Sequence, residues 1–193
     1  MTDATRQTAP SPWVRLGAEL PSDLGKRRVL VVGPGGESDG LAVEKAAAVE
    51  RWDPTGSVPR PAGPFDLFIS AGALQADPHP ANLMTAFSDV AAPGATLLLH
   101  SRVLTDPEQS MYARFVGADA GVGGSEWLPG RLALRWTVET NGFDIERWID
   151  AGPADPRGEG DAYLLATRNE RTPALILATP ATIDGPSQKR GKA

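Results

Sequence analysis

Short apolar runs separated by glycine and proline turns divide the first part of the chain into alternating elements. The run at 28–33 (RVLVVG) ends at glycine, which is typical of a buried parallel strand. Residues 39–48 begin with Asp39, a good N-cap, and predict a helix. The run at 49–53 predicts a second strand, which Pro54 stops. Strand, helix and strand in this order form a βαβ unit, which requires a parallel sheet with a right-handed crossover.

The rest of the chain continues the same alternation. Residues 54–64 contain four prolines and two glycines, so we expect a loop there. The patterns then predict strands at 65–70 and 95–100 and helices at 80–91 and 130–141. A capping box at 105–108 predicts a short helix, and this helix would carry Met111 and Phe115. The last two runs, 143–150 and 161–168, predict a closing antiparallel strand pair. We expect a flexible leader (1–12), one domain (13–170) and a tail (171–193) that is largely disordered after about residue 180. Within that tail, the apolar residues 173–178 are candidates for an extra edge strand or for a segment docked on the domain.

Composition narrows the range of functions. The chain has 193 residues, of which 41% are hydrophobic, enough for one packed domain. It has no cysteine and only two histidines, which excludes disulfide scaffolds and thiol nucleophiles and makes an ordinary zinc site, or any metal site, unexpected. A net charge of −5 without a basic face argues against nucleic-acid binding. There is no apolar stretch long enough for a membrane span and no secretory signal, so we expect a soluble, cytoplasmic protein.

Four segments between residues 12 and 168 together resemble class I S-adenosylmethionine (SAM) methyltransferases. They are VLVVGPGG at 29–36, Asp53 at the end of the next strand, FDLFISAGALQADPHPANLMTAFSDVAAPGATLLL at 65–99, and EWLPGRLALRWTVETNGFDIERW at 126–148. The last segment is similar to a subgroup related to the tRNA-wobble-uridine-modifying methyltransferases. The resemblance implies an α/β, Rossmann-like, mostly parallel sheet with an antiparallel closing pair. It also implies SAM as cofactor and methyl transfer to an O, N or C nucleophile of a small molecule.

The resemblance assigns cofactor binding to six positions near strand ends: Gly33, Gly35, Gly36, Asp53, Ser70 and Gly72. Glycines let the backbone approach a ligand and leave amide groups free for its carboxylate. An acid such as Asp53 can accept hydrogen bonds from both ribose hydroxyls. The alternatives are that the glycines only form a turn with positive φ, and that Asp53 is a solvated turn acid.

Two histidines are candidates for the reacting end of the site. His100 ends a core strand, and ligands of open α/β sheets gather at such ends, where an imidazole can accept a proton from the attacking group. The alternative for His100 is a partly buried histidine with satisfied hydrogen bonds. His79 lies between prolines and is the second candidate, although such a residue is more often a surface histidine.

Two residues of the fourth segment are substrate-binding candidates. Trp127 could stack on a planar substrate, and Arg131 could pair with a carboxylate or phosphate. The alternative for Trp127 is that its side chain packs against the sheet and holds its loop there. Trp136 and Trp148 lie inside predicted elements, where we expect them in the core.

The sequence also departs from the family pattern. Val31 replaces a usual acid, Glu37 stands at the third turn-glycine position, and Gln75 with Ala76 replaces a common histidine. The 11 residues between Asp53 and Phe65 cannot form the usual helix and strand, so we expect the sheet to lack its third strand. These departures favour an alternative function: a degenerate methyltransferase fold without methyl transfer, acting as a binding or assembly subunit or catalysing another reaction such as a cyclisation.

The missing strand exposes the flank of the 49–53 strand and the neighbouring Trp52. Because unpaired sheet edges and apolar surface attract partners, we expect this flank to be covered. The candidates are the N-terminal leader, the tail at 173–180, and another subunit in a homo-oligomer or a partner complex.

Overall fold

The computed structural model describes residues 11–33, 41–116, 126–149 and 155–170. Its helices are α1 (Pro12–Gly17), α2 (Ala73–Ala76), α3 (Pro80–Val90) and α4 (Arg131–Thr140), with 3-10 turns η1 (Leu24–Lys26) and η3 (Pro107–Gln109). Its strands are β1 (Arg28–Val32), β2 (Ala48–Trp52), β3 (Phe65–Ala71), β4 (Ala91–Leu104), β5 (Ala113–Val116), β6 (Glu126–Pro129), β7 (Phe143–Ile149) and β8 (Glu159–Arg168). No helix in these ranges is long and apolar enough to cross a membrane.

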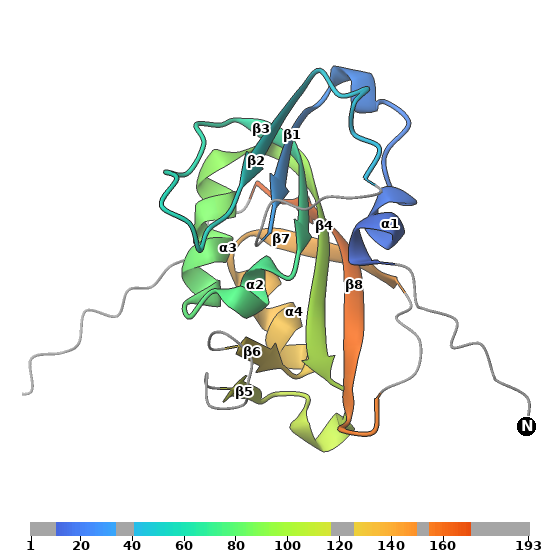
Figure 1. Cartoon of the computed structure of the whole chain (residues 1–193), viewed down its shortest axis with the longest axis vertical. Helices are drawn as coiled ribbons and strands as arrows, with labels where there is room; N and C mark the ends of the chain where they lie inside the picture. The colour runs from blue at the N-terminus through green and yellow to red at the C-terminus, as the bar shows by residue number, and fades with distance from the viewer. Residues whose placement is uncertain (1–10, 34–40, 117–125, 150–154, 171–193) are drawn as a thin grey trace, which may run out of the picture.

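One sheet has the strand order β2-β1-β3-β4-β8-β7 (Figure 1), and β5 and β6 form a separate hairpin. Strands β2, β1, β3 and β4 pair in parallel, whereas β8 is antiparallel to both β4 and β7. This confirms the predicted mostly parallel sheet with an antiparallel pair at one end.

The sheet has a hydrophobic core on each face. On one face α3 and α4 cover a cluster that contains Phe68, Phe87 and Phe143. On the other face Leu16 of α1 and the coil around Leu41 cover a second cluster. Alternate residues of each strand supply the two clusters because side chains alternate across a strand.

The predicted loss of the third strand is confirmed. Residues 53–64 contain no helix or strand, and β2 therefore ends the sheet. The Trp52 indole nitrogen donates to the Val58 carbonyl at 3.3 Å, so the loop folds back over the end of β2. How the outer flank of β2 is covered stays a prediction, because residues 1–10 and 171–193 lie outside the described ranges.

The predicted helix at 39–48 is wrong over its described part. Residues 41–47 form turns and coil, and Ala48 already belongs to β2. Leu41 and Val43 are both buried in the second core cluster. Residues two apart point to different sides of a helix, so burying both on one core requires a non-helical backbone.

The helix predicted after residue 105 is also wrong. Only the three residues of η3 are helical, and their cap is Asp106, whose carboxylate accepts from the Glu108 amide, rather than Thr105. Met111 and Phe115 are exposed, and Phe115 pairs with Trp127 in the β5–β6 hairpin. Trp136, expected in the core, is 65% exposed.

Candidate functional site

The carboxyl ends of three parallel strands bring together four of the predicted cofactor residues. Gly33 follows β1, Asp53 follows β2, and Ser70 and Gly72 lie at the end of β3, which is paired with β1. Gly35 and Gly36 lie outside the described residues. The strand ends therefore collect Gly33, Asp53, Ser70 and Gly72 on one edge of the sheet, where ligands of open α/β sheets bind.

Gly33 is needed here for close packing. A Cβ at this position would lie 2.9 Å from the Ala71 carbonyl oxygen and 3.0 Å from the Trp13 indole. Trp13, Gly33, Trp52 and Asp53 are among the residues that line a cavity of about 190 Å³ at the ends of β1 and β2. The side chains that line this cavity thus include two indoles, the Asp53 carboxylate and the Arg51 guanidinium.

The Asp53 carboxylate is held in a tight turn. Its Oδ1 accepts from the backbone amide of Thr55 at 2.9 Å and from the Thr55 hydroxyl at 2.6 Å. A carboxylate offers about four acceptor sites, and these two bonds fix its orientation at the end of β2. Asp53 therefore has the turn role that its alternative interpretation described.

Ser70 contributes a buried hydroxyl to this edge of the sheet, whereas Gly72 contributes a backbone conformation. The Ser70 hydroxyl is fully buried and has no hydrogen-bond partner within the described ranges. Gly72 has φ +71°, which favours glycine, and its amide donates to the His100 carbonyl at 3.3 Å. An orphaned buried hydroxyl is the kind of group that a bound molecule or water satisfies.

The described residues fit the nucleoside end of SAM. Aromatic walls suit a purine ring, and the oriented carboxylate at the end of β2 suits ribose hydroxyls. Gly35 and Gly36, which the resemblance assigns to the same cofactor, belong to the segment 34–40, which lies outside the described residues.

His100 is buried on the α1 side of the sheet. It pairs with Ala71 of β3 and Tyr163 of β8, and its Nε2 lies 3.0 Å from Asp161 Oδ1. An ionised carboxylate only accepts hydrogen bonds, so Nε2 carries the hydrogen of this pair. The other ring nitrogen, Nδ1, is buried and has no partner within the described residues.

The surroundings of His100 stabilise a charged Asp161. The hydrogen bond from His100 lowers the pKa of Asp161 below its ordinary value, against the opposing effect of burial. The Tyr163 ring lies 4.8 Å from the His100 ring, and burial raises the pKa of this phenol. The Arg15 guanidinium covers the same Tyr163 ring at 5.5 Å.

Asp161→Ala is expected to lower the free energy of unfolding at pH 7 by about 1 kcal/mol, because it leaves the His100 ring without its partner. Asp161→Asn keeps an acceptor and should cost less. Because the pKa of Asp161 is lowered from 3.8, its charge stabilises the fold above that pH, and this contribution is lost as the pH falls through the lowered value.

Urea unfolding of both variants at pH 7 and below pH 3.8 checks this expectation. The difference between the natural chain and Asp161→Asn should shrink at the lower pH, and the control Asp144→Asn on β7 should show no such change. An unchanged difference across the pH range would contradict the assignment.

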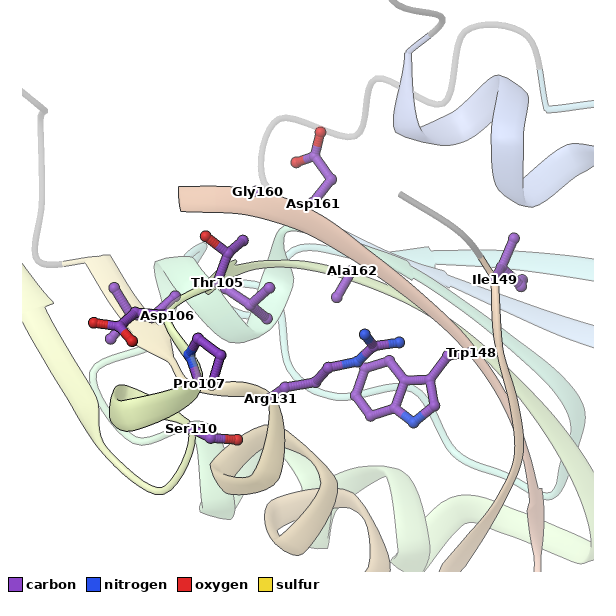
Figure 2. A pocket seen from close by; sticks show the side chains of 12 residues that line it. Thr105, Asp106, Pro107, Ser110, Arg131, Trp148, Ile149, Gly160, Asp161 and Ala162 are labelled. Atoms are coloured by element: carbon purple, nitrogen blue, oxygen red, sulfur yellow. The ribbon is translucent and has the colours of Figure 1, made fainter. Parts of the chain in front are cut away.

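The remaining candidates, His79, Trp127 and Arg131, lie in three different environments. His79 is exposed at the start of α3 and lines neither described cavity. Trp127 is 4% exposed and packs in the core cluster, as its alternative interpretation held. Arg131 begins α4 and lines a second cavity, of about 310 Å³ (Figure 2).

Sequence analysis missed two residues near these sites. Trp13 follows Ser11 and Pro12, and this N-cap with proline is a helix-start signal that would have placed the tryptophan on a helix. Asp161 carries no local signal, because its contact with His100 joins residues 61 positions apart.

No family model matches this sequence, and no curated protein was found as a relative. Solved structures do match. A SAM-dependent methyltransferase from Mesorhizobium loti has 17% identity and a TM-score of 0.57, over 83% of this chain and 99% of that one. The 1,6-didemethyltoxoflavin-N1-methyltransferase of Burkholderia thailandensis, solved with 1,6-didemethyltoxoflavin and S-adenosylhomocysteine (SAH), has 15% identity and a TM-score of 0.61, over 84% and 80%.

A third match is the N-terminal domain of EvdMO1, solved in the presence of SAH and D-fucose, with 13% identity and a TM-score of 0.58 over 84% of this chain and 85% of that one. None of the three is described as a tRNA-modifying enzyme, so the likeness to that subgroup stays a prediction. At such identities the likeness shows the fold. The chain has the class I SAM-dependent methyltransferase fold.

Proposed function

We propose that this protein is a SAM-dependent methyltransferase that acts on a small-molecule nucleophile. The observation that carries the proposal is the cavity at the ends of β1 and β2, where Gly33 and Asp53 meet two indole rings. The SAH and the small molecule bound to the Burkholderia thailandensis enzyme support the same assignment for a chain of this fold.

When bound, SAM supplies a methyl group on a sulfonium: the nucleophile's lone pair forms a bond to the methyl carbon, the carbon–sulfur bond breaks, and its electrons remain on sulfur in SAH. The chain contributes mainly binding and orientation. Gly33 lets the strand end approach the nucleoside, and Asp53 accepts from the ribose hydroxyls. Holding two reactants in the right geometry supplies a large part of the rate in such transfers.

His100 is the proposed acceptor of the nucleophile's proton. It lies beside Ala71, the last residue of β3, and its Nδ1 lone pair is directed away from the bond that Nε2 makes with Asp161. A histidine held by a carboxylate has a defined tautomer and orientation, which a general base requires.

Calorimetric titration with SAH tests the proposal. The natural chain should bind SAH, and Asp53→Ala should weaken binding by about 1–3 kcal/mol, about 5- to 150-fold, because a charged hydrogen-bond acceptor is lost. Asp144→Ala, at the opposite edge of the sheet, is the matched control and should bind normally.

Two outcomes would overturn the proposal or part of it. No SAH binding by the natural chain at millimolar ligand would favour a binding or assembly subunit over an enzyme. Normal binding by Asp53→Ala would show that the ribose is held elsewhere.

A further inference from the structure

The larger cavity lies on the α3–α4 side of the sheet, away from β1 and β2. It is enclosed by the carboxyl end of β4, the start of β8, the end of β7 and the first turn of α4 (Figure 2), and its volume is about 310 Å³. Arg131 and Trp148 form one end, and Thr105, Asp106 and Ser110 form the other. Between these two polar ends the walls are apolar.

Arg131 is the informative residue of this cavity. Its guanidinium carbon lies 4.6 Å from the centre of the Trp148 ring, and Trp148 in turn packs against the core. Within the described residues Arg131 makes no ion pair or hydrogen bond through its side chain. Stacking on an indole holds a guanidinium in place while its five N–H donors stay available for an anion.

Neighbouring arginines are arranged differently. Arg102 and Arg114 both pair with the buried carboxylate of Glu159, and Arg135, one turn along α4, pairs with Glu139 at 2.9 Å. The chain carries 24 acidic residues against 19 lysines and arginines, so acids are not scarce. An arginine that is stacked in a cavity but not ion-paired by the described chain points to a ligand's acid.

The opposite end of the cavity limits which acid fits. The Asp106 carboxylate accepts from the Glu108 amide at 2.9 Å and from the Gln109 side chain at 3.1 Å, and it retains acceptor capacity. The Thr105 hydroxyl donates to the Gly158 carbonyl, so its oxygen can still accept. A nearby carboxylate repels a second negative charge and attracts a hydrogen-bond donor. The Asp161 carboxylate points away from Arg131 (Figure 2) and is occupied by His100.

We infer that this cavity binds a small organic carboxylate, a monoanion that carries a hydroxyl or amino group. The carboxylate pairs with Arg131, the apolar body contacts Trp148 and Ile149, and the donor group faces Asp106. A dianionic phosphate is disfavoured because Asp106 would repel its second charge. Pairing of guanidinium with carboxylate is directional and often bidentate, which orients the ligand.

The acid bound in this cavity is also the methyl acceptor, and this step rests on the proposed function. In the sheet order, β3 and β4 separate the nucleoside cavity at β2 and β1 from the cavity beside β4, β8 and β7. Strands are spaced by about 4.8 Å, so β1 and β4 are about 10 Å apart. β3 therefore lies between the two cavities, whereas His100 faces the α1 side of the sheet, opposite the face that carries the larger cavity.

Binding of 4-hydroxybenzoate, measured by calorimetry at neutral pH, tests the inference, with 4-hydroxybenzyl alcohol and phenyl phosphate as the neutral and dianionic comparisons. The natural chain should bind the carboxylate at least 10-fold more tightly than either comparison. Arg131→Gln should weaken carboxylate binding at least 10-fold. Arg135→Gln, on the same helix, is the matched control and should leave it unchanged. Both variants should bind SAH like the natural chain.

The outcomes separate the two proposals. Three results would overturn the carboxylate site. They are carboxylate binding by Arg131→Gln as tight as by the natural chain, binding of the alcohol or the phosphate more tightly than the carboxylate, and no binding of any probe. Binding of SAH in those cases would leave the proposed function standing. If the carboxylate binds in a way that depends on Arg131 but SAH does not bind, the carboxylate site is supported and the proposed methyl transfer is contradicted.

Discussion

Phe68→Ala is expected to lower the free energy of unfolding by about 3–5 kcal/mol, the usual cost of removing a buried phenylalanine side chain. Phe68 is fully buried on β3 at the centre of a group of aromatic rings. Its ring centre lies 6.1 Å from that of Phe65, 5.5 Å from Phe87 and 6.2 Å from Phe143. The substitution therefore leaves a cavity between the sheet and α3 that the surrounding rings cannot refill.

Urea unfolding measures this loss, and Phe115→Ala is the matched control. Phe115 is 57% exposed on β5, so its removal should change the free energy of unfolding by less than about 0.5 kcal/mol. Similar losses in the two variants would show that the aromatic group around Phe68 is not the centre of the core.

Gly130→Ala is expected to destabilise the fold by about 3 kcal/mol, at the upper end of the cost of overpacking. Gly130 has an ordinary φ of −70°, so its backbone conformation does not require glycine. A Cβ there would lie 2.1 Å from the Gln109 carbonyl oxygen and 2.4 Å from that of Ser110. Both are backbone atoms, so the turn or the start of α4 must move, and the Gly130 amide would lose its bond to the Tyr112 carbonyl.

Thermal and urea unfolding measure this effect against Gly56→Ala. A Cβ at Gly56 would lie 3.4 Å from its nearest neighbour, which is ordinary contact, so the control should be nearly neutral. Because Arg131 follows Gly130, the variant should also bind 4-hydroxybenzoate more weakly. Full stability in Gly130→Ala would contradict the packing of η3 against α4.

Strand positions were predictable because buried parallel strands have a continuous apolar sequence. The runs that begin at Arg28, Phe65 and Ala95 each became a central strand, and Gly142, with φ +83°, ends α4 where expected. The loss of the third strand followed from chain length alone, since 11 residues with four prolines cannot supply a helix and a strand.

Two helix predictions failed because contacts distant in sequence outweighed local preference. The segment after Asp39 contains good helix formers, but Leu41 and Val43 are both buried against the sheet. The segment after Thr105 has a helix-start signal, but Phe115 pairs across the hairpin with Trp127. Helix propensity amounts to less than about 1 kcal/mol per ordinary residue, and tertiary packing overrides it.

For the site, the sequence alone determined that Gly33 and Asp53 stand at the carboxyl ends of strands, because each follows directly from where an apolar run stops. His100 was expected to end its strand as well, but β4 continues to Leu104 through its pairing with β8. Only the tertiary structure decided their neighbours. Trp13 lies against Gly33, Asp161 holds His100, and Trp148 holds Arg131. Strand ends are local features that hydrophobic patterning records, whereas the partner of a side chain depends on how segments far apart in sequence pack, which the local pattern does not contain.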